Sequence, residues 1–456
     1  MKLMSLFDGS GGFPLAASLC GIEPVYAAEV EPYPIAVTKN RFPKMKHLGD
    51  VSKVKGGEIE PVDIITFGSP CQDMSIAGKR AGLKHADMGD DETTRSGLFL
   101  EAIRIIKEMR EATNGVYPRY AIWENVPGAF SSNRGEDFRT VLEEFIRVKE
   151  KDAVMPDVPK AGWPYADCYS GNGWSLAYRV FDAQYWGVPQ RRRRIYLVAD
   201  FRGECAQEIL FKRESLRGYF GAGRTPWQGI AADAQNCVGT AIGGVDRYNQ
   251  SFLPGLAQTL RAPGGGDCTP TVLAPVAVYC HQGNGIDRAD TAGCNGKGWK
   301  EDTSYTLNTI DKPAVVCAQK SYTEFKDEST LSTLKATDGS YGGGSENIVV
   351  KNYIVRRLTP TECARLQGFP SWWGIVNPVE NLTDEDYAFW LDVRNTYAEI
   401  NGKATKEYTR EQMLAWYNKL HSDSAEYKMW GNGIALPNAL YVMQGIAEVV
   451  GVHHSK

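Results

Sequence analysis

Cys71 is the residue of this sequence that is best placed to act as a nucleophile. Residues 64–67 form a short apolar run with the length of a buried strand. The turn that follows contains Gly68 and Pro70 and presents Cys71 just beyond the strand. In open α/β sheets chemistry sits at the carboxyl ends of strands, and a thiolate there is nucleophilic when nearby positive charge draws off its proton. The alternative is an inert buried thiol, since the chain has ten cysteines.

A carboxyl group at the end of a second predicted strand could be the acid partner of this thiol. The strand is expected at Ala121–Trp123, and Glu124 follows it directly. A carboxyl group beside a nucleophile stands where a general acid is needed. The alternative is an exposed glutamate in a turn.

A glycine-rich turn near the N-terminus could hold a nucleotide. Lys2 to Phe7 predict a buried strand, which is followed by Asp8-Gly9-Ser10-Gly11-Gly12 and a helix through Cys20. Such a turn lets the backbone approach a ligand at the start of a helix. Glu29 ends a second predicted strand, about 20 residues beyond the glycines, where an acidic residue binds ribose hydroxyls. The spacing G-x-G-G, instead of G-x-G-x-x-G, makes a dinucleotide the weaker choice.

The composition is that of a globular chain without a structural metal. The chain has 456 residues, of which 43% are hydrophobic and 23% charged, and room for two domains or one large domain with insertions. Its net charge of −4 argues against a protein that coats nucleic acid non-specifically, although a local basic cleft remains compatible. The cysteines show no Cys-x-x-Cys spacing, and Cys280-His281 is a lone pair, so no metal site is expected. We expect no signal peptide and no membrane span, and a reducing, cytoplasmic location.

Helices and strands alternate over the first 200 residues and give way to a β-rich region. Helical spacing predicts helices over Ser96 to Arg110 and over Asp137 to Glu150, with a loop between 151 and about 165. Strands are expected at Tyr178 to Phe181 and at Ile195 to Val198. From about Arg202 to Asn352, glycine, threonine, serine and proline dominate.

Three degenerate repeats in this interval each contain two β-prone segments, which we interpret as successive hairpins with long turns. The segments of the three repeats are residues 257–260 with 272–273, 305–307 with 315–316, and 332–334 with 348–350. A disordered linker is the alternative, and the returning Val and Ile clusters argue against it.

The C-terminal quarter is predicted to be helical. Thr359, Pro360 and Glu362 form a capping box with proline in the first turn, and the helix is expected to stop at Gly368. An aromatic-rich helical stretch follows, with another capping box at Thr409 to Gln412. Residues 431–437 open a final helix.

Several of these segments together resemble the DNA (cytosine-5) methyltransferases of bacterial or phage type. The resemblance covers about the first 200 residues and the segments near 356–370 and 430–450. Its motifs follow in the family's order: Phe7 to Phe13, the nucleophile loop from Gly68 to Gly82, Glu124-Asn125-Val126-Pro127, Gln190 to Arg194, Arg357 to Pro370, and Gly431 to Pro437. The run Arg191 to Arg194 could be a solvated charge cluster, but its place in the fourth motif indicates a role in the site.

The resemblance implies S-adenosylmethionine as cofactor, double-stranded DNA as partner, a monomer and no metal. The implied catalytic residues are Cys71, Glu124, Arg192 and Arg194. Strand alternation would point Arg191 and Arg193 elsewhere. The implied cofactor residues are Phe7, Asp8, Gly9, Gly11, Gly12, Glu29, Val30, Asp50, Val51, Pro70, Leu98, Asn432 and Gly433. The implied DNA-binding residues are Gln72, Ser75, Lys79, Asn125 and Gln190. Some members have serine at the place of Gly433, so a hydroxyl contact is missing here.

The resemblance also implies an α/β fold: a Rossmann-like S-adenosylmethionine methyltransferase domain, mostly parallel with helices on both faces, plus a smaller β-rich target-recognition domain. The expected divisions are a catalytic domain over 1–201, target recognition over 202–352, its scaffold motif over 353–372, a helical insertion over 373–429 and a returning helix over 430–456. The returning helix is expected to pack beside the first strand. The resemblance assigns no role to the insertion.

Three other functions compete with this one. A relative on the same fold could methylate cytosine in tRNA, and another could bind DNA without catalysis, although the intact Cys71 and Glu124 disfavour the second. A dinucleotide oxidoreductase is disfavoured by the glycine spacing. The recognised DNA sequence does not follow from the motifs, because base contacts come from side chains in 202–352 that the sequence does not place.

Overall fold

The computed structural model describes residues 1–69, 97–153, 155, 157–188, 190, 192–211 and 359–451, and the backbone of eight short strands between 243 and 357. The nucleophile loop from Pro70 to Lys79, with Cys71, Gln72 and Ser75, lies outside these residues. The predictions made for those side chains therefore stay predictions.

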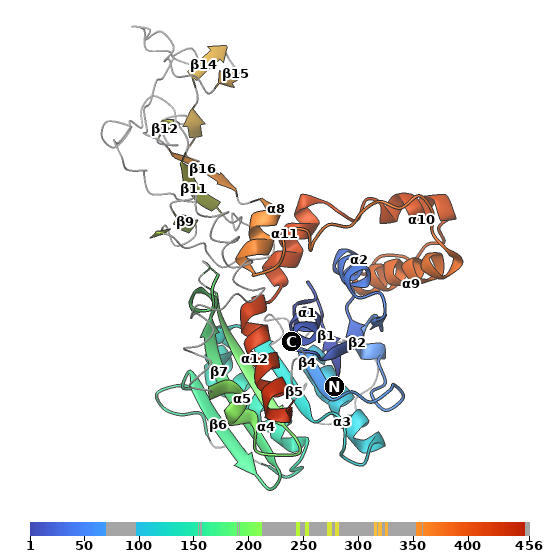
Figure 1. Ribbon diagram of the computed structural model, residues 1–456, viewed down its shortest axis with the longest axis vertical. Coiled ribbons are helices and arrows are strands. Elements are labelled where there is room, and N and C mark those ends of the chain that lie inside the picture. The colour runs from blue at the N-terminus through green and yellow to red at the C-terminus, as the bar shows by residue number, and fades with distance from the viewer. Residues whose placement is uncertain are drawn as a thin grey trace.

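An eight-stranded mixed sheet with the order β3-β2-β1-β4-β5-β8-β7-β6 forms the centre of the molecule (Figure 1). The strands are β1 Lys2–Leu6, β2 Glu23–Ala28, β3 Lys46–His47, β4 Ile64–Phe67, β5 Tyr120–Asn125, β6 Ala166–Gly171, β7 Trp174–Asp182 and β8 Arg193–Asp200. The pairs from β3 through β5 are parallel, whereas β5–β8, β8–β7 and β7–β6 are antiparallel. The predicted α/β class, with a mostly parallel sheet, is confirmed.

Alternate residues of the central strands enter two separate cores, one on each face of the sheet. Ile64 and Ile122 face a core shared with α1 Gly12–Leu19, α5 Ala206–Phe211 and α12 Leu436–Val450. Ile65 and Trp123 face the other core, which is covered by α3 Gly97–Ala112 and α4 Glu136–Arg147. This two-residue period places Glu124 on the α1 and α12 face, because it follows Ile122 by two positions.

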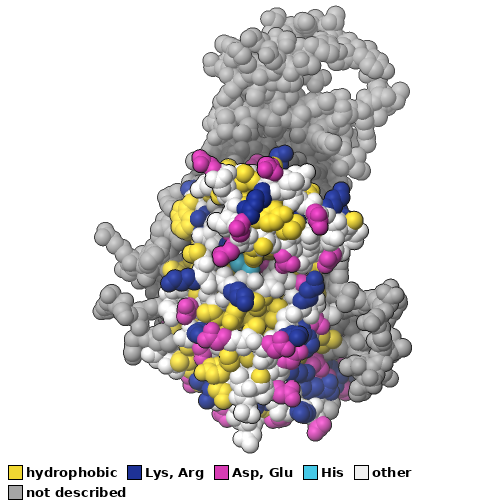
Figure 2. All heavy atoms as spheres, turned by 90° about the vertical axis from the view of Figure 1, so that its right-hand side faces the viewer, with side chains coloured by type: hydrophobic (Ala, Val, Ile, Leu, Met, Phe, Trp, Pro, Cys, Tyr) yellow, Lys and Arg dark blue, Asp and Glu magenta, His cyan; other side chains and the backbone are white. Residues whose placement is uncertain are grey.

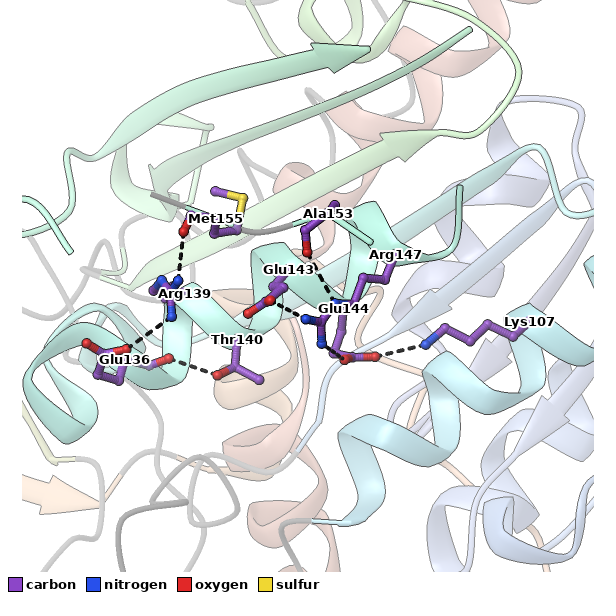
Figure 3. A network of polar contacts seen from close by, with 9 residues as sticks. All are labelled: Lys107, Glu136, Arg139, Thr140, Glu143, Glu144, Arg147, Ala153 and Met155. Carbon is purple, nitrogen blue, oxygen red and sulfur yellow. Dashed lines mark hydrogen bonds and ion pairs between the residues drawn. The ribbon is translucent and has the colours of Figure 1, made fainter. Parts of the chain in front are cut away.

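Helix α4 is also fixed by polar contacts on its exposed side (Figure 3). Lys107 of α3 pairs with Glu144 at 2.9 Å, and Arg147 pairs with Glu143 at 2.5 Å. Arg139 donates to the carbonyl of Met155 at 2.7 Å. These contacts join α3, α4 and the chain after α4.

Two elements packed in or on the sheet, β6 and α5, were not predicted from the sequence. Strand β6, Ala166–Gly171, was not predicted, because it is an edge strand whose residues show no apolar run. Helix α5 shares the core of the sheet through Ala206, Ile209 and Leu210. Residues up to Phe211 therefore pack on the sheet, and the division of the chain into domains stays a prediction.

The β-rich region pairs differently from the predicted hairpins. The described strands are β9 Gly243–Asp246, β10 Ser251–Pro254, β11 Thr271–Pro275, β12 Tyr279–His281, β13 Ala314–Val316, β14 Ala318–Ser321, β15 Glu324–Lys326 and β16 Tyr353–Arg357. β11 pairs with β9 and with β16, and β12 pairs with β13. The predicted pairing of 272–273 with 257–260 is wrong, because β9 and β16 occupy both edges of β11. The pairings predicted for the other two repeats stay predictions. The segments 257–260, 305–307, 332–334 and 348–350 lie outside the described residues.

The C-terminal part is helical, as expected. The helices are α8 Pro360–Leu366, α9 Asp384–Ile400, α10 Arg410–Tyr417 and α11 Asp423–Asn432, followed by α12. Both predicted capping boxes are present, at Thr359 with Glu362 and at Thr409 with Gln412. Helices α9 and α10 extend beside α2 Pro32–Arg41 (Figure 1). Short 3-10 helices complete the described elements: η1 Val51–Lys53, η4 Pro127–Phe130, η5 Ser132–Gly135 and η6 Ala183–Tyr185.

The final helix departs from its prediction in two details. Residues 431 and 432 still belong to α11, and α12 begins only at Leu436. Helix α12 lies against α1 and α5, so helices separate most of it from the first strand. No single described helix is long and apolar enough to cross a membrane; only the bent pair α11 and α12 reaches the length together.

The contact between α12 and α5 gives a test of the packing of α5. A methyl group on Gly445 would lie 2.8 Å from the carbonyl oxygen of Ile209. Gly445→Ala should therefore lower the free energy of unfolding by about 1–3 kcal/mol through overpacking. If α5 did not pack here, the same change would stabilise the helix by about 0.5–1 kcal/mol, so the sign of the change in urea denaturation decides the matter.

Candidate active site

The first residues of the nucleophile loop are fixed by side chains of the neighbouring strand β5. Trp123 donates its indole N–H to the Ser69 hydroxyl at 3.1 Å, and the Asn125 amide donates to the Ser69 carbonyl at 3.2 Å. Asn125 is 1% exposed, and its carbonyl oxygen accepts the N–H of Val126. These internal contacts indicate that Asn125 supports the loop. The sequence had suggested Asn125 as a DNA-binding residue, and it had singled out neither Ser69 nor Trp123 as a residue of the site.

Glu124 is buried at the end of β5, directly beside the end of β4. Parallel pairing sets Phe67 opposite Trp123, so Gly68 and Glu124 follow at the same edge. A side chain on residue 68 would begin 3.2 Å from Glu124 Oε2. Glycine therefore leaves the space in which this carboxyl group lies, next to the start of the Cys71 loop.

Arg194 forms an ion pair with Glu124 across the sheet. Its Nε lies 3.1 Å from Glu124 Oε1, and each of the two side chains is 11% exposed. Burial raises the pKa of Glu124 above its ordinary value, while the charges of Arg194 and Arg192 oppose the rise. The Tyr196 ring, which the sequence did not single out, lies opposite Glu124 in the ladder, and burial raises its pKa well above the ordinary value. The site therefore favours a carboxyl group that can hold a proton.

The other arginines of the run have different contacts. Arg192 is 1% exposed and donates to the carbonyl oxygens of Gly431 and Gly433. Arg193 is exposed, with its guanidinium 4.7 Å from the centre of the Tyr165 ring. The predicted alternation is confirmed for these residues, and Arg191 lies outside the described part. Arg192 thus ties the active-site run to the C-terminal segment, which indicates a positioning role for a residue first suggested as catalytic.

Gln190 lies beside this run. Its side chain is fully buried, and its backbone N–H donates to the carbonyl of Val188 at 2.8 Å. The residue therefore sits within the protein at the start of the run, and its predicted contact with DNA stays a prediction.

The glycine turn is shaped by Glu29. Gly9 and Gly11 have φ values of 54° and 75°, which glycine adopts without strain. Glu29 Oε2 accepts the N–H of Gly9 at 2.8 Å, and Oε1 accepts the N–H groups of Val30 and Glu31 at 2.8 and 2.9 Å. The carboxylate is partly exposed and has acceptor capacity left for a hydroxyl group. Glu29 consequently holds the turn, and its contact with a ribose stays a prediction.

Asp8 adds a second carboxyl group to the turn. It is 8% exposed, and burial, assisted by the charge of Glu29, raises its pKa to about 8, although the Ser5 hydroxyl opposes the rise. The Glu29 carboxylate suits a ligand that carries hydroxyl groups, and a positive charge on the ligand would oppose the rise in the pKa of Asp8 and favour its ionised form. S-adenosylmethionine carries both, as a sulfonium, an ammonium and a ribose diol, so the residues present fit this cofactor.

The remaining predicted cofactor residues surround the turn less directly. Asp50 caps η1 by accepting the N–H of Ser52 at 2.9 Å, and Val51 is buried beside it. Phe7, Val30 and Leu98 are partly exposed, Gly12 is buried, and Asn432 is exposed at the end of α11. Their contacts with a cofactor stay predictions.

Gly433 lies directly against the turn. A side chain there would begin 2.8 Å from the Ser10 hydroxyl oxygen. The Ser10 side chain thus occupies the space that a side chain at residue 433 would need. Among the described residues, no cluster of His, Cys, Asp and Glu could hold a metal ion.

Comparison with known proteins identifies the family. The model of the C-5 cytosine-specific DNA methylase family matches residues 1–149 and 282–385, which is more than half of the chain. A protein of Escherichia phage P1 named DNA N-6-adenine-methyltransferase is 28% identical over 98% of this chain and 61% of its own length. Type II methyltransferase M1.ScrFI of Lactococcus lactis subsp. cremoris is 28% identical over 81% of this chain and 69% of its own length. The chain spans 45% of another relative, Type II methyltransferase M2.BsuMI of Bacillus subtilis.

A crystal structure of a putative DNA modification methyltransferase from an Escherichia coli prophage aligns over 99% of both chains, with 17% identity and a TM-score of 0.43, at which the likeness carries no argument. The match of the family model is sufficient by itself. The chain belongs to the C-5 cytosine-specific DNA methylase family.

The raised pKa of Asp8 predicts how the stability of the protein without cofactor depends on pH. An Asp with a pKa of about 8 when folded binds more protons in the folded state than in the unfolded state between about pH 4 and pH 8. The free energy of unfolding should fall as pH rises through this range. Asp8→Asn should flatten the slope in urea denaturation at several pH values. Equal slopes for the two proteins would contradict the burial of a protonated Asp8.

Proposed function

We propose that this protein transfers a methyl group from S-adenosylmethionine to carbon 5 of a cytosine in DNA, through a covalent adduct of Cys71 at carbon 6. The observation that carries the proposal is the buried pair of Glu124 and Arg194, which lies beside Gly68 and Ser69 at the start of the Cys71 loop. Membership of the family supports the same reaction.

The residues of the site can together overcome the low reactivity of carbon 5 of cytosine. Carbon 5 of cytosine is a poor nucleophile, so the Cys71 thiolate first adds to carbon 6, and Glu124 donates a proton to N3 as the ring accepts electrons. Arg194 holds the Glu124 carboxyl group in place and stabilises its ionised form after the proton has left. When bound, the cofactor supplies an electrophilic methyl group for carbon 5. Loss of the carbon 5 proton to solvent then expels the Cys71 thiolate, and N3 returns its proton to Glu124, which restores the aromatic ring.

The burial of Glu124 requires the base to leave the DNA helix. Glu124 is 8% exposed, so N3 of a stacked and paired cytosine cannot reach its carboxyl group. Flipping the base costs a few kcal/mol of stacking and pairing, which contacts in the pocket must offset. We assign this role to Gln72, Ser75, Lys79 and Gln190, together with Cys71 of the nucleophile loop.

Target recognition is proposed for the β-rich region, from residue 212 to residue 352. Its strand β11 pairs with β16, and β16 leads directly into α8 beside the catalytic unit. This connection supports a recognition part that is joined to the site through the scaffold motif. We further propose that the protein acts as a monomer on double-stranded DNA in the cytoplasm.

Methylation of adenine is the second candidate, because the phage P1 relative carries that activity in its name. The alignment covers 61% of that protein, so a large part of it has no counterpart here. The amino nitrogen of adenine attacks a methyl group without prior addition of a thiol. Methylation of cytosine at carbon 5 therefore needs a buried acid beside a nucleophile loop, and methylation of adenine at its amino nitrogen does not.

The methylated product separates these functions directly. The wild-type protein, incubated with isotopically labelled cofactor and either duplex DNA or tRNA, should place label in 5-methylcytosine of the DNA, as measured by mass spectrometry of the nucleosides. Label in N6-methyladenine, or in tRNA alone, would contradict the proposal. Cys71→Ser should bind the cofactor and leave the DNA unlabelled.

The proton on Glu124 predicts a pH dependence. Because burial raises the pKa of this residue, the protonated form persists to higher pH, and kcat/KM should fall on the alkaline side as the proton is lost. Glu124→Gln should lower kcat/KM by about 10²–10⁴-fold. The pH profile of the residual activity should lack the alkaline fall that loss of the Glu124 proton causes. An unchanged rate and profile in the Gln variant would remove Glu124 from proton transfer.

A further inference from the structure

A four-residue segment, Trp372–Ile375, contacts the glycine turn and is called the strap below. It follows α8 and leads into the helical insertion. Trp373 is 3% exposed, and its indole N–H donates to the carbonyl oxygen of Ser10 at 2.8 Å. Ser10 stands between the two left-handed glycines of the turn. The strap thus reaches the backbone of the turn from a point more than 360 residues away in the chain.

Helix α2 holds the strap through its backbone. Arg41 donates to the carbonyl oxygens of residues 372, 373 and 375 at 2.6, 2.9 and 2.8 Å. Tyr33 donates its hydroxyl to the carbonyl of Gly374 at 2.6 Å. All four consecutive carbonyl groups of the strap therefore accept hydrogen bonds from one helix. Irregular backbone that is satisfied in this way has a defined position.

Helix α2 also begins close to Glu29, whose carboxylate shapes the glycine turn. Glu29 accepts the N–H of Gly9, and α2 starts three residues later at Pro32. The insertion is attached to this part of the molecule as well. Lys428 of α11 pairs with Glu31 at 2.6 Å, and Lys39 of α2 lies 4.6 Å from the Phe389 ring centre in α9.

The surface on this side of the molecule does not suit a phosphate backbone. Figure 2 shows the side that lies to the right in Figure 1, where positive and negative side chains of the described residues are mixed without a field of one sign. A nucleic-acid surface needs clustered positive charge. The insertion instead contacts α2, the helix that holds the strap.

We propose that Trp373 is a positioning residue for the cofactor turn, and that the rest of the helical insertion, from residue 376 to residue 429, holds the strap in place. Because a peptide unit is planar, fixing the Ser10 carbonyl fixes the whole Ser10–Gly11 peptide. A turn that is already in its bound shape loses less entropy when the ligand binds. The inference rests on the proposed function, since it takes S-adenosylmethionine as the ligand of the turn.

The test compares the same substitution at two neighbouring positions of the full-length protein. Trp373→Phe removes the indole N–H and keeps an aromatic ring. Trp372→Phe is the matched control, because Trp372 is 53% exposed and phenylalanine keeps an aromatic ring near the Arg41 guanidinium, which lies 4.9 Å from the centre of the Trp372 ring. Calorimetry with S-adenosylmethionine should give an affinity about fivefold weaker for Trp373→Phe, the effect of one lost hydrogen bond, and no change for Trp372→Phe. The KM for the cofactor should rise by the same factor, with unchanged kcat and KM for DNA.

A rise in the KM for the cofactor alone distinguishes a positioning role of Trp373 from a general loss of stability. A merely structural role would lower the melting temperature and disturb kcat and both KM values together. If Trp373→Phe does not fold, Arg41→Lys provides a second variant, which keeps the charge, loses the forked contacts and should show the same split. Unchanged cofactor affinity in these variants, or an equal loss in Trp372→Phe, would overturn the proposal. Failure of the wild-type protein to bind the cofactor would overturn the proposed function itself.

Discussion

The burial of one carboxyl group, Glu124, is the constraint on which the rest of the site depends. A charged group out of water is costly unless it is paired, and here the partner is Arg194 on the adjacent antiparallel strand. That pairing requires β8 to lie beside β5, in a register that sets Glu124 opposite Tyr196. The mixed sheet is thus the arrangement that brings an arginine of a late strand to an acid at the end of an early one.

The cofactor side of the molecule is joined to this pair through the backbone of the C-terminal segment. Arg192, two residues before Arg194, holds the carbonyl groups of Gly431 and Gly433, and Gly433 lies against Ser10 of the glycine turn. Trp373 holds the same turn from its other side. The acid, the turn and the returning segment are therefore joined by a continuous series of contacts.

Sequence patterns of a few residues predicted strands, helix caps and side-chain alternation correctly, but they could not predict contacts between residues far apart in the chain. The strand before Gly68, the capping box at Thr359 and the alternation of Arg192 to Arg194 each follow from neighbours in sequence. The edge strand β6 was missed because its residues show no apolar run, and the hairpin prediction for the first repeat failed because β11 pairs with β16, about 80 residues away. The contact between Ser10 and Trp373 has no signature in the sequence. The assignment of Cys71 still depends on its motif alone, since the loop lies outside the described residues.

Trapping of the covalent intermediate tests the account most directly. Fluorine at carbon 5 cannot leave as a cation, so the adduct between the Cys71 sulfur and carbon 6 should persist after methylation. DNA with 5-fluorocytosine at the target should give, in the presence of cofactor, a protein–DNA complex that survives denaturing gel electrophoresis. The wild-type protein should form this complex and Cys71→Ser should not. Methylation of ordinary DNA by Cys71→Ser at a comparable rate would contradict the assigned nucleophile and the mechanism built on it.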